Sequence, residues 1–131
     1  MPNSIRISAV FPTFPENMYR CWLDSEKHTA MTGEPAQCSA EVGETFMAWD
    51  GYITGRNLEL EPGKRILQLW RTADFQVNDP DSRLEILMES TPGGTLLTLI
   101  HTEIPANQPD YETGWQEFYF EPMLEFFERA Y

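Results

Sequence analysis

The sequence predicts an α+β fold in which a curved antiparallel sheet of about six strands is covered by a long C-terminal helix. Three observations lead to this prediction. Two short helical segments follow a first strand, strand-like runs separated by short turns occupy the region from position 36 onward, and the last 21 residues carry aromatic side chains at helical spacing. A chain of 131 residues without repeats or linkers is expected to form a single domain over residues 1–131.

The N-terminal part of the chain predicts one strand and two short helices. Apolar and polar residues alternate in Ser4–Phe11, which is typical of a half-buried strand. The first helix is expected over Glu16–Leu23, where apolar residues recur at i, i+1 and i+4. A second helix is expected between Asp24, a good N-cap residue, and Gly33, which favours a helix end.

The central part of the chain predicts five consecutive strands. Asp50-Gly51 between two β-rich runs is the strongest hairpin signal, and Pro-Gly pairs mark two further turns. Short hairpin connections make neighbouring strands antiparallel. The predicted strands are Gly43–Trp49, Tyr52–Glu61, Arg65–Arg71, Ser82–Ser90 and Thr95–Ile104.

The last segment, Tyr111–Tyr131, predicts a long helix that packs against an apolar surface. Eight of its 21 residues are aromatic and none is lysine. At 100° per residue one broad stripe faces the sheet. It consists of Trp115, Phe118, Tyr119, Pro122, Met123 and Phe126. Phe120, Leu124 and Phe127 project away from this stripe, so that either a wrapped sheet edge covers them or the protein self-associates as a homodimer.

The charge of the chain restricts its partners. Twenty-one acidic and nine basic residues give a net charge of −12, which repels nucleic acids and anionic membrane surfaces. We therefore expect neither nucleic acid nor membrane as a partner. The N-terminus lacks the pattern of a secretion signal, and Cys21 and Cys38 are too few for a disulfide framework. The expected location is the cytoplasm, with both thiols reduced.

Several short segments recur in a spacing that resembles a known family. They are Phe46, Asp50-Gly51, Gly55, Leu58-x-Leu60-x-Pro62, Arg65-Ile66, Trp70-Arg71, Thr95-x-Leu97-x-Leu99-x-His101, Tyr111-x-x-Gly114-Trp115 and Pro122. This set resembles the activator of Hsp90 ATPase-like family of the START-like (Bet v 1-like) superfamily. The resemblance covers nearly the whole chain and implies the helix-grip fold of that superfamily. The eukaryotic activators also carry an N-terminal domain with an Asn-Asn-Trp-His-Trp-type motif, and the resemblance here is to their C-terminal module.

Aromatic residues in the central strands and the last helix are the best candidates for a binding site. Where a curved sheet and a covering helix diverge, a cavity results, and aromatic walls suit a flat apolar ligand. The alternative is that these rings fill the interior themselves. The candidate ligand-binding residues are Phe46, Trp49, Tyr52, Trp70, His101, Trp115, Phe118 and Tyr119.

Four polar residues have separate expected roles. His28 is expected at the surface, near acidic residues in the sequence. His101 shares a strand face with two leucines, so it either faces the cavity as a ligand-binding group or base, or is a core histidine bonded to the backbone, Tyr111 or Tyr119. Arg56 and Arg71 either orient an anionic ligand group or extend outward to an acidic neighbour such as Glu59.

Motifs for catalysis are absent from the sequence. No serine lies in a Gly-x-Ser-x-Gly elbow, no glycine-rich loop cradles phosphate, and two distant histidines do not make a metal site. We name no catalytic residue, no metal and no cofactor. The sequence leaves three functions open: binding of a small hydrophobic or aromatic ligand, interaction with an Hsp90-type chaperone, and cyclase-like or hydrolase-like catalysis in the same cavity.

Overall fold

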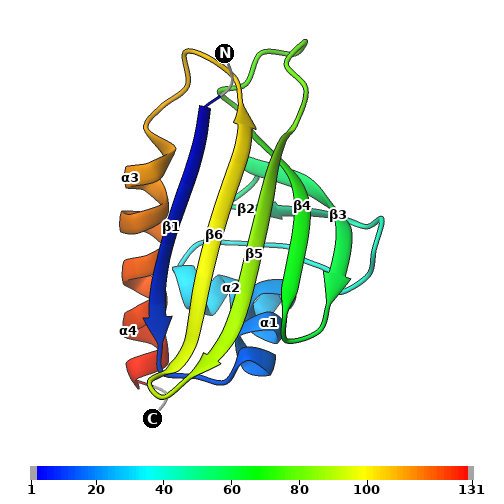
Figure 1. Cartoon of the computed structure of the whole chain (residues 1–131). Helices are drawn as coiled ribbons and strands as arrows, with labels where there is room; N and C mark the ends of the chain where they lie inside the picture. Colours follow the sequence, from blue (N-terminus) through cyan, green and yellow to red (C-terminus); the bar gives the residue numbers. More distant parts are fainter. Residues whose placement is uncertain (1–2, 130–131) are drawn as a thin grey trace.

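A six-stranded antiparallel sheet forms the frame of the protein, which a computed structural model describes over residues 3–129 (Figure 1). The strand order is β1-β6-β5-β4-β3-β2, so the five strands that follow one another in sequence also neighbour one another in space. The strand β1 pairs with β6 at one edge. The strands are β1 (Asn3–Phe11), β2 (Thr45–Ala48), β3 (Ile53–Glu61), β4 (Arg65–Thr72), β5 (Ser82–Thr91) and β6 (Gly94–Ile104).

The helices lie together on one face of this curved sheet (Figure 1). Two short helices, α1 (Pro15–Leu23) and α2 (Ser25–Thr32), connect β1 to β2. The C-terminal helix runs along β1 and consists of α3 (Tyr111–Trp115), a π-helical turn η1 (Gln116–Phe120) and α4 (Glu121–Arg129). The predicted fold is therefore confirmed. The C-terminal helix was predicted to continue to Tyr131, but positions 130 and 131 lie outside the described residues.

The boundaries of the short helices follow from local chemistry. The Asp24 carboxylate accepts a hydrogen bond from the Lys27 backbone N–H at the start of α2, as expected for an N-cap. Gly33 ends α2 in the left-handed conformation, with φ of 86°. The predicted strand Gly43–Trp49 is too long at both ends, because β2 comprises only Thr45–Ala48. At the C-terminal end, the turn after β2 already begins at Trp49, which has φ of 54°.

The π-helical turn changes which side of the C-terminal helix is buried. Its extra residue lets both Tyr119 and Phe120 face inward, and Phe127 follows them into the core. The assignment of Phe120 and Phe127 to the outer side of the helix is therefore wrong: they are only 5% and 1% exposed. Phe118, which was placed on the inner stripe, is 52% exposed instead.

The buried Phe120 and Phe127 pack against the first strand. Both rings contact Phe11 of β1 edge-on, with centroids 5.5 and 6.2 Å away. The prediction of self-association relied on three outward residues, of which only Leu124 is exposed. The sheet edge at β1 thus covers Phe120 and Phe127, which is the alternative to self-association.

Two buried histidines fasten the C-terminal helix to the rest of the protein. His28 of α2 is 3% exposed, so its predicted place at the surface is wrong. Its Nδ1 donates to the Trp22 carbonyl oxygen (2.8 Å), and its Nε2 accepts from the Tyr119 hydroxyl (2.9 Å). This bond joins α2 to η1. Burial lowers the pKa of His28, so the ring stays neutral.

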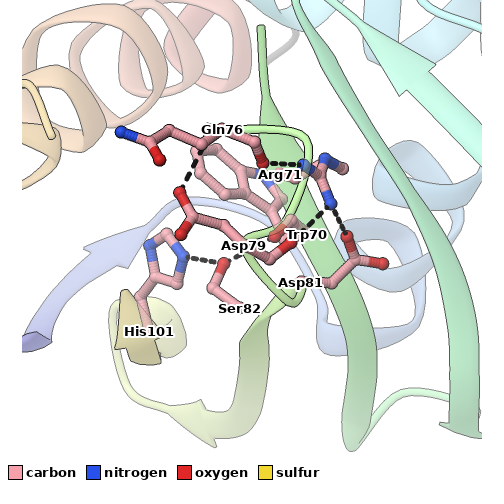
Figure 2. Close-up of polar contacts among 7 residues, drawn as sticks. All are labelled: Trp70, Arg71, Gln76, Asp79, Asp81, Ser82 and His101. Atoms are coloured by element: carbon pink, nitrogen blue, oxygen red, sulfur yellow. Dashed lines mark hydrogen bonds and ion pairs between the residues drawn. The ribbon is translucent and has the colours of Figure 1, made fainter. Parts of the chain in front are cut away.

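The second histidine, His101, joins β6 to α3. Trp115 Nε1 donates to His101 Nδ1 (3.1 Å), so His101 carries its proton on Nε2. This Nε2 donates to Ser82 Oγ (2.8 Å), as Figure 2 shows. Ser82 then donates to the Trp70 carbonyl oxygen (2.6 Å). A protonated His101 would turn a second N–H toward the Trp115 N–H. Burial lowers the pKa of His101 from 6.5 to about 3.

The neutral state of His101 predicts a specific pH dependence of stability. Between pH 6.5 and 3 the unfolded chain binds a proton at this ring that the folded protein does not, so stability falls as the pH falls through this range. Around pH 5 this contributes about 1.4 kcal/mol per pH unit to the slope of the unfolding free energy. We expect His101→Gln to reduce that slope by about one proton, measured by urea denaturation at several pH values.

The His28→Gln variant serves as the comparison, and it should also reduce the slope because His28 is buried and neutral. Carboxylate titration contributes equally to all three proteins and cancels in the difference. An unchanged slope in His101→Gln would show that His101 titrates in the folded protein and that the deduced hydrogen-bond directions are wrong.

Candidate functional site

An apolar pocket of about 240 Å³ lies between the sheet and the C-terminal helix. Strand β3 and β4 supply one wall, the turn after β2 supplies the side, and α3 with η1 supplies the opposite wall. Seven of its nine lining residues are aromatic. The lining residues are Trp49, Tyr52, Ile53, Trp70, Tyr111, Gly114, Trp115, Phe118 and Tyr119.

The inner wall of the pocket is a packed group of rings held by the His101 hydrogen bonds. The Trp70 and Trp115 centroids are 5.5 Å apart, and Trp115 lies 4.8 Å from Tyr119. His101 packs edge-on to Trp70 at 4.5 Å. Since both nitrogens of His101 are engaged, the ring has no free nitrogen to accept a substrate proton. His101 therefore positions the two tryptophans and is not suited to act as a base.

Trp49 and Phe118 line one side of the pocket. Their rings meet edge-to-face with centroids 5.3 Å apart. Trp49 sits in the turn after β2, and Phe118 projects from η1 as a half-exposed side chain. Gly114, one turn earlier on the helix, leaves space here, because a Cβ at this position would contact only the Phe118 ring at 3.9 Å.

The tyrosine hydroxyls at the β3–β4 end of the pocket are already engaged. Tyr111 donates to Gln108 Oε1 (2.7 Å) and accepts from Thr72 Oγ1 (2.6 Å), and the Tyr52 hydroxyl donates to the Asp74 carboxylate. Burial raises the pKa of Tyr111 and of Tyr52. These hydroxyls are neutral at pH 7, and the pocket wall carries no charged side chain among the described residues.

The structure brings most of the predicted binding residues together. Trp49, Tyr52, Trp70, Trp115, Phe118 and Tyr119 line the pocket. His101 lies behind Trp70 and Trp115, and its partners are Ser82 and Trp115 rather than a tyrosine. Phe46 lines a separate groove, where a Cβ at Gly55 would come within 2.6 Å of its ring. Whether these residues bind a ligand stays a prediction.

Three lining residues were not among the candidates. Tyr111 precedes Trp115 by four positions, which is the helical spacing that could have identified it. Gly114 and Ile53 carry no signal of their own, because their contribution is the space that they leave or a small apolar surface.

The two candidate arginines point away from the pocket. Arg71 binds Asp81 (2.8 Å) and the carbonyl oxygens of Gln76 and Asp79, which fastens the loop between β4 and β5 (Figure 2). Arg56 donates to the Gly43 carbonyl oxygen (2.6 Å). Both arginines therefore serve loop structure, while Glu59 pairs with Arg65 instead.

Two further properties of residues 3–129 bear on function. No group of histidine, cysteine and carboxylate side chains in this range is arranged to hold a metal ion. No helix in it is long and apolar enough to cross a membrane.

Comparisons with known proteins agree with the fold and the family resemblance. A family model described as "Activator of Hsp90 ATPase homolog 1-like protein" matches residues 12–128. The activators of 90 kDa heat shock protein ATPase homolog 1 of Mus musculus and Homo sapiens are 31% and 30% identical over 124 residues, which is 94% of this chain. The chain spans 36% of the length of each of these relatives.

Solved structures show the same fold. A protein from Mesorhizobium loti superimposes with a TM-score of 0.83 at 20% identity, covering 98% of this chain and 99% of that one. An Hsp90 activator from Plasmodium falciparum gives a TM-score of 0.81 at 24% identity, covering 90% and 91%. With the family model matching most of its length, the chain belongs to the activator of Hsp90 ATPase homolog 1-like family.

Proposed function

We propose that the protein binds a small, flat hydrophobic or aromatic molecule in the pocket between the sheet and the C-terminal helix. The observation that supports this is a space of about 240 Å³ whose walls are mostly aromatic rings. An apolar cavity of about 150 Å³ is enough to hold benzene, so this pocket has room for roughly two fused rings. Aromatic walls offer such a molecule stacking and edge contacts on several sides.

The size of the pocket limits the affinity. Removing about 200 Å² of apolar ligand surface from water contributes about 5 kcal/mol, before the cost of association. Taken as an upper limit on the binding free energy, this corresponds to a dissociation constant no tighter than about 0.2 mM for a simple two-ring hydrocarbon. Tighter binding requires polar contacts in addition to burial.

Gly114 provides a direct test of pocket occupancy. We expect Gly114→Leu to abolish binding of naphthalene, because a leucine side chain at this position fills part of the pocket that Gly114 lines. The fold should be retained, since replacing a helical glycine by a better helix former stabilises by up to about 1 kcal/mol. Binding is measured by ligand-observed NMR or calorimetry and stability by thermal denaturation.

Gly114→Ala is the matched control for this experiment. Its single methyl group makes only an ordinary contact with Phe118, so naphthalene binding should persist within about threefold, the change that a small loss of packing produces. Equal naphthalene binding by the leucine variant and the unmodified protein would place the ligand elsewhere and contradict the proposal.

The second candidate function is interaction with an Hsp90-type chaperone. It is favoured by the mouse and human relatives, whose names describe activators of the 90 kDa heat shock protein ATPase. An outer groove of about 480 Å³, lined by the C-terminal helix together with Thr32 of α2 and Trp49, offers a surface for such a contact. Phe118 and Leu124 lie in this groove among Glu117, Glu121 and Glu125, so it suits a basic protein segment with an apolar anchor.

Charge reversal tests this second candidate. We expect Glu117→Lys combined with Glu121→Lys to weaken binding to a purified Hsp90-type chaperone at least tenfold, because like charges across an interface repel. Surface plasmon resonance at two salt concentrations measures the effect, which should shrink at high salt. Glu44→Lys combined with Glu89→Lys makes the same charge change at exposed positions outside the groove. A similar loss in both double variants would mean that only net charge matters.

A further inference from the structure

The wall that residues 3–129 form around the pocket consists mostly of aromatic rings and presents almost no polar atom to the enclosed space. The two lining residues without a ring, Ile53 and Gly114, are also apolar. A ligand group that needs hydrogen bonds, such as a hydroxyl, a carboxylate or a protonated amine, would lose its contacts with water here without replacement. The pocket therefore selects ligands whose surface requires no hydrogen bond.

The rings of the wall also have an electrostatic preference. An aromatic ring is negative on its faces and positive at its edge, so a cation over a face is attracted. The plane of Trp115 is inclined by 41° to that of Trp70 and by 54° to that of Tyr119. The planes of Trp49 and Phe118 are inclined by 70°. A group placed among rings of such different orientation meets faces as well as edges.

No positive charge in the wall opposes a cation. Among residues 3–129, no arginine, lysine or histidine lines the pocket. Arg71 directly follows the lining residue Trp70 in β4, but its guanidinium is paired with the Asp81 carboxylate (2.8 Å). A cationic ligand therefore meets no repelling side chain at the wall itself.

The exposed part of the wall has acidic neighbours. Tyr52 and Phe118 are the most exposed large side chains that line the pocket, at 38% and 52%. The Tyr52 hydroxyl donates to the carboxylate of the exposed Asp74, and the exposed Glu117 directly precedes Phe118 in the helix. The net charge of −12 adds a general attraction for cations. A positive group on this side of the pocket thus has rings as its contacts and carboxylates nearby.

We propose that the pocket binds a flat aromatic cation whose nitrogen carries an alkyl group and no proton, as in an N-alkylpyridinium or N-alkylquinolinium ion. Such a nitrogen has no hydrogen-bond donor, so a wall without polar atoms leaves nothing unpaired. The ring system lies against Trp70 and Trp115, and the alkylated nitrogen lies toward Tyr52 and Phe118. This inference rests on the proposed ligand-binding function and names its ligand class.

Three two-ring probes of similar size test the proposal on the unmodified protein by calorimetry or ligand-observed NMR. N-methylquinolinium and 1-methylnaphthalene have nearly the same shape and differ in charge, whereas 1-naphthoate at pH 7 carries the opposite charge. We expect N-methylquinolinium to bind about fivefold or more tightly than 1-methylnaphthalene, because cation–π contacts shielded from water outweigh the cost of dehydrating the cation. The anion 1-naphthoate should bind most weakly, because nothing in the wall replaces its hydration.

The outcomes separate this inference from the function on which it rests. If 1-methylnaphthalene binds as tightly as N-methylquinolinium or more tightly, the cation inference is overturned while the ligand-binding function stands. If neither of these two probes binds, the ligand-binding function is overturned. Repeating the titrations in about 1 M salt screens the exposed carboxylates but leaves contacts with buried rings. A preference for the cation that vanishes at high salt would belong to the acidic surface and contradict the proposal.

Two matched variants locate the charged nitrogen. Phe118→Leu removes a ring from the wall but keeps an apolar side chain at a half-exposed position. The ratio of the N-methylquinolinium and 1-methylnaphthalene affinities should fall about two- to fivefold, the effect of one lost cation–π contact. Phe126→Leu makes the same change at a ring of the same helix that does not line the pocket, so the ratio should remain. An unchanged ratio in Phe118→Leu would contradict the proposed position of the nitrogen.

A measurement on the unmodified protein tests the same position without a substitution. The N-methyl protons of bound N-methylquinolinium should show nuclear Overhauser contacts to the ring protons of Tyr52 and Phe118. Their signal should move upfield on binding, because protons over the face of an aromatic ring are shielded. A downfield shift, or contacts only to residues outside the pocket, would overturn the proposal.

Discussion

The hydrogen bond from Trp115 to His101 is the contact on which the arrangement of the site depends. It crosses from the C-terminal helix to β6, and through Ser82 it continues to the backbone of Trp70 on β4. The two tryptophans that form the inner wall of the pocket therefore belong to one connected polar network. The side-chain donors and acceptors of Trp115, His101 and Ser82 are all paired in this network, and a buried network of that kind holds its members in one geometry. Rings packed by apolar contact alone would be freer to move into the neighbouring space.

The π-helical turn adapts the helix to two different neighbours. Tyr111, Trp115 and Tyr119 follow one another at intervals of four and face the pocket side, whereas Phe120 and Phe127 face β1. The extra residue of the π turn shifts the register of the helix, so that Phe120 and Phe127 reach β1 while Trp115 and Tyr119 stay at the pocket. Phe118 is left half-exposed. Turns of this kind are frequent at functional sites.

The fold could be predicted because its signals are local. Strand alternation, the Asp50-Gly51 turn and the Asp24 and Gly33 caps each act over a few residues. The burial of His28 could not be predicted in this way, since its partner Tyr119 lies 91 residues further along the chain. The assumed period of 3.6 residues failed at Phe120 because no residue in the helix announces the π turn. The aromatic character of the pocket was visible in the sequence, but its volume depends on how far helix and sheet stand apart.

The pocket and the outer groove share a wall, which connects the two candidate functions physically. Trp49 and Phe118 line both of them, one on each side of the same pair of rings. A ligand that displaces Phe118 also changes the surface that a protein partner meets. By linkage, any factor by which a ligand changes the affinity for the partner equals the factor by which the partner changes the affinity for the ligand. Substitutions at Phe118 therefore affect both sites together, whereas Gly114 lines only the pocket and Glu121 lines only the groove. Substitutions at Gly114 and Glu121, rather than at the shared rings, can therefore separate the effect of ligand binding from the effect of partner binding.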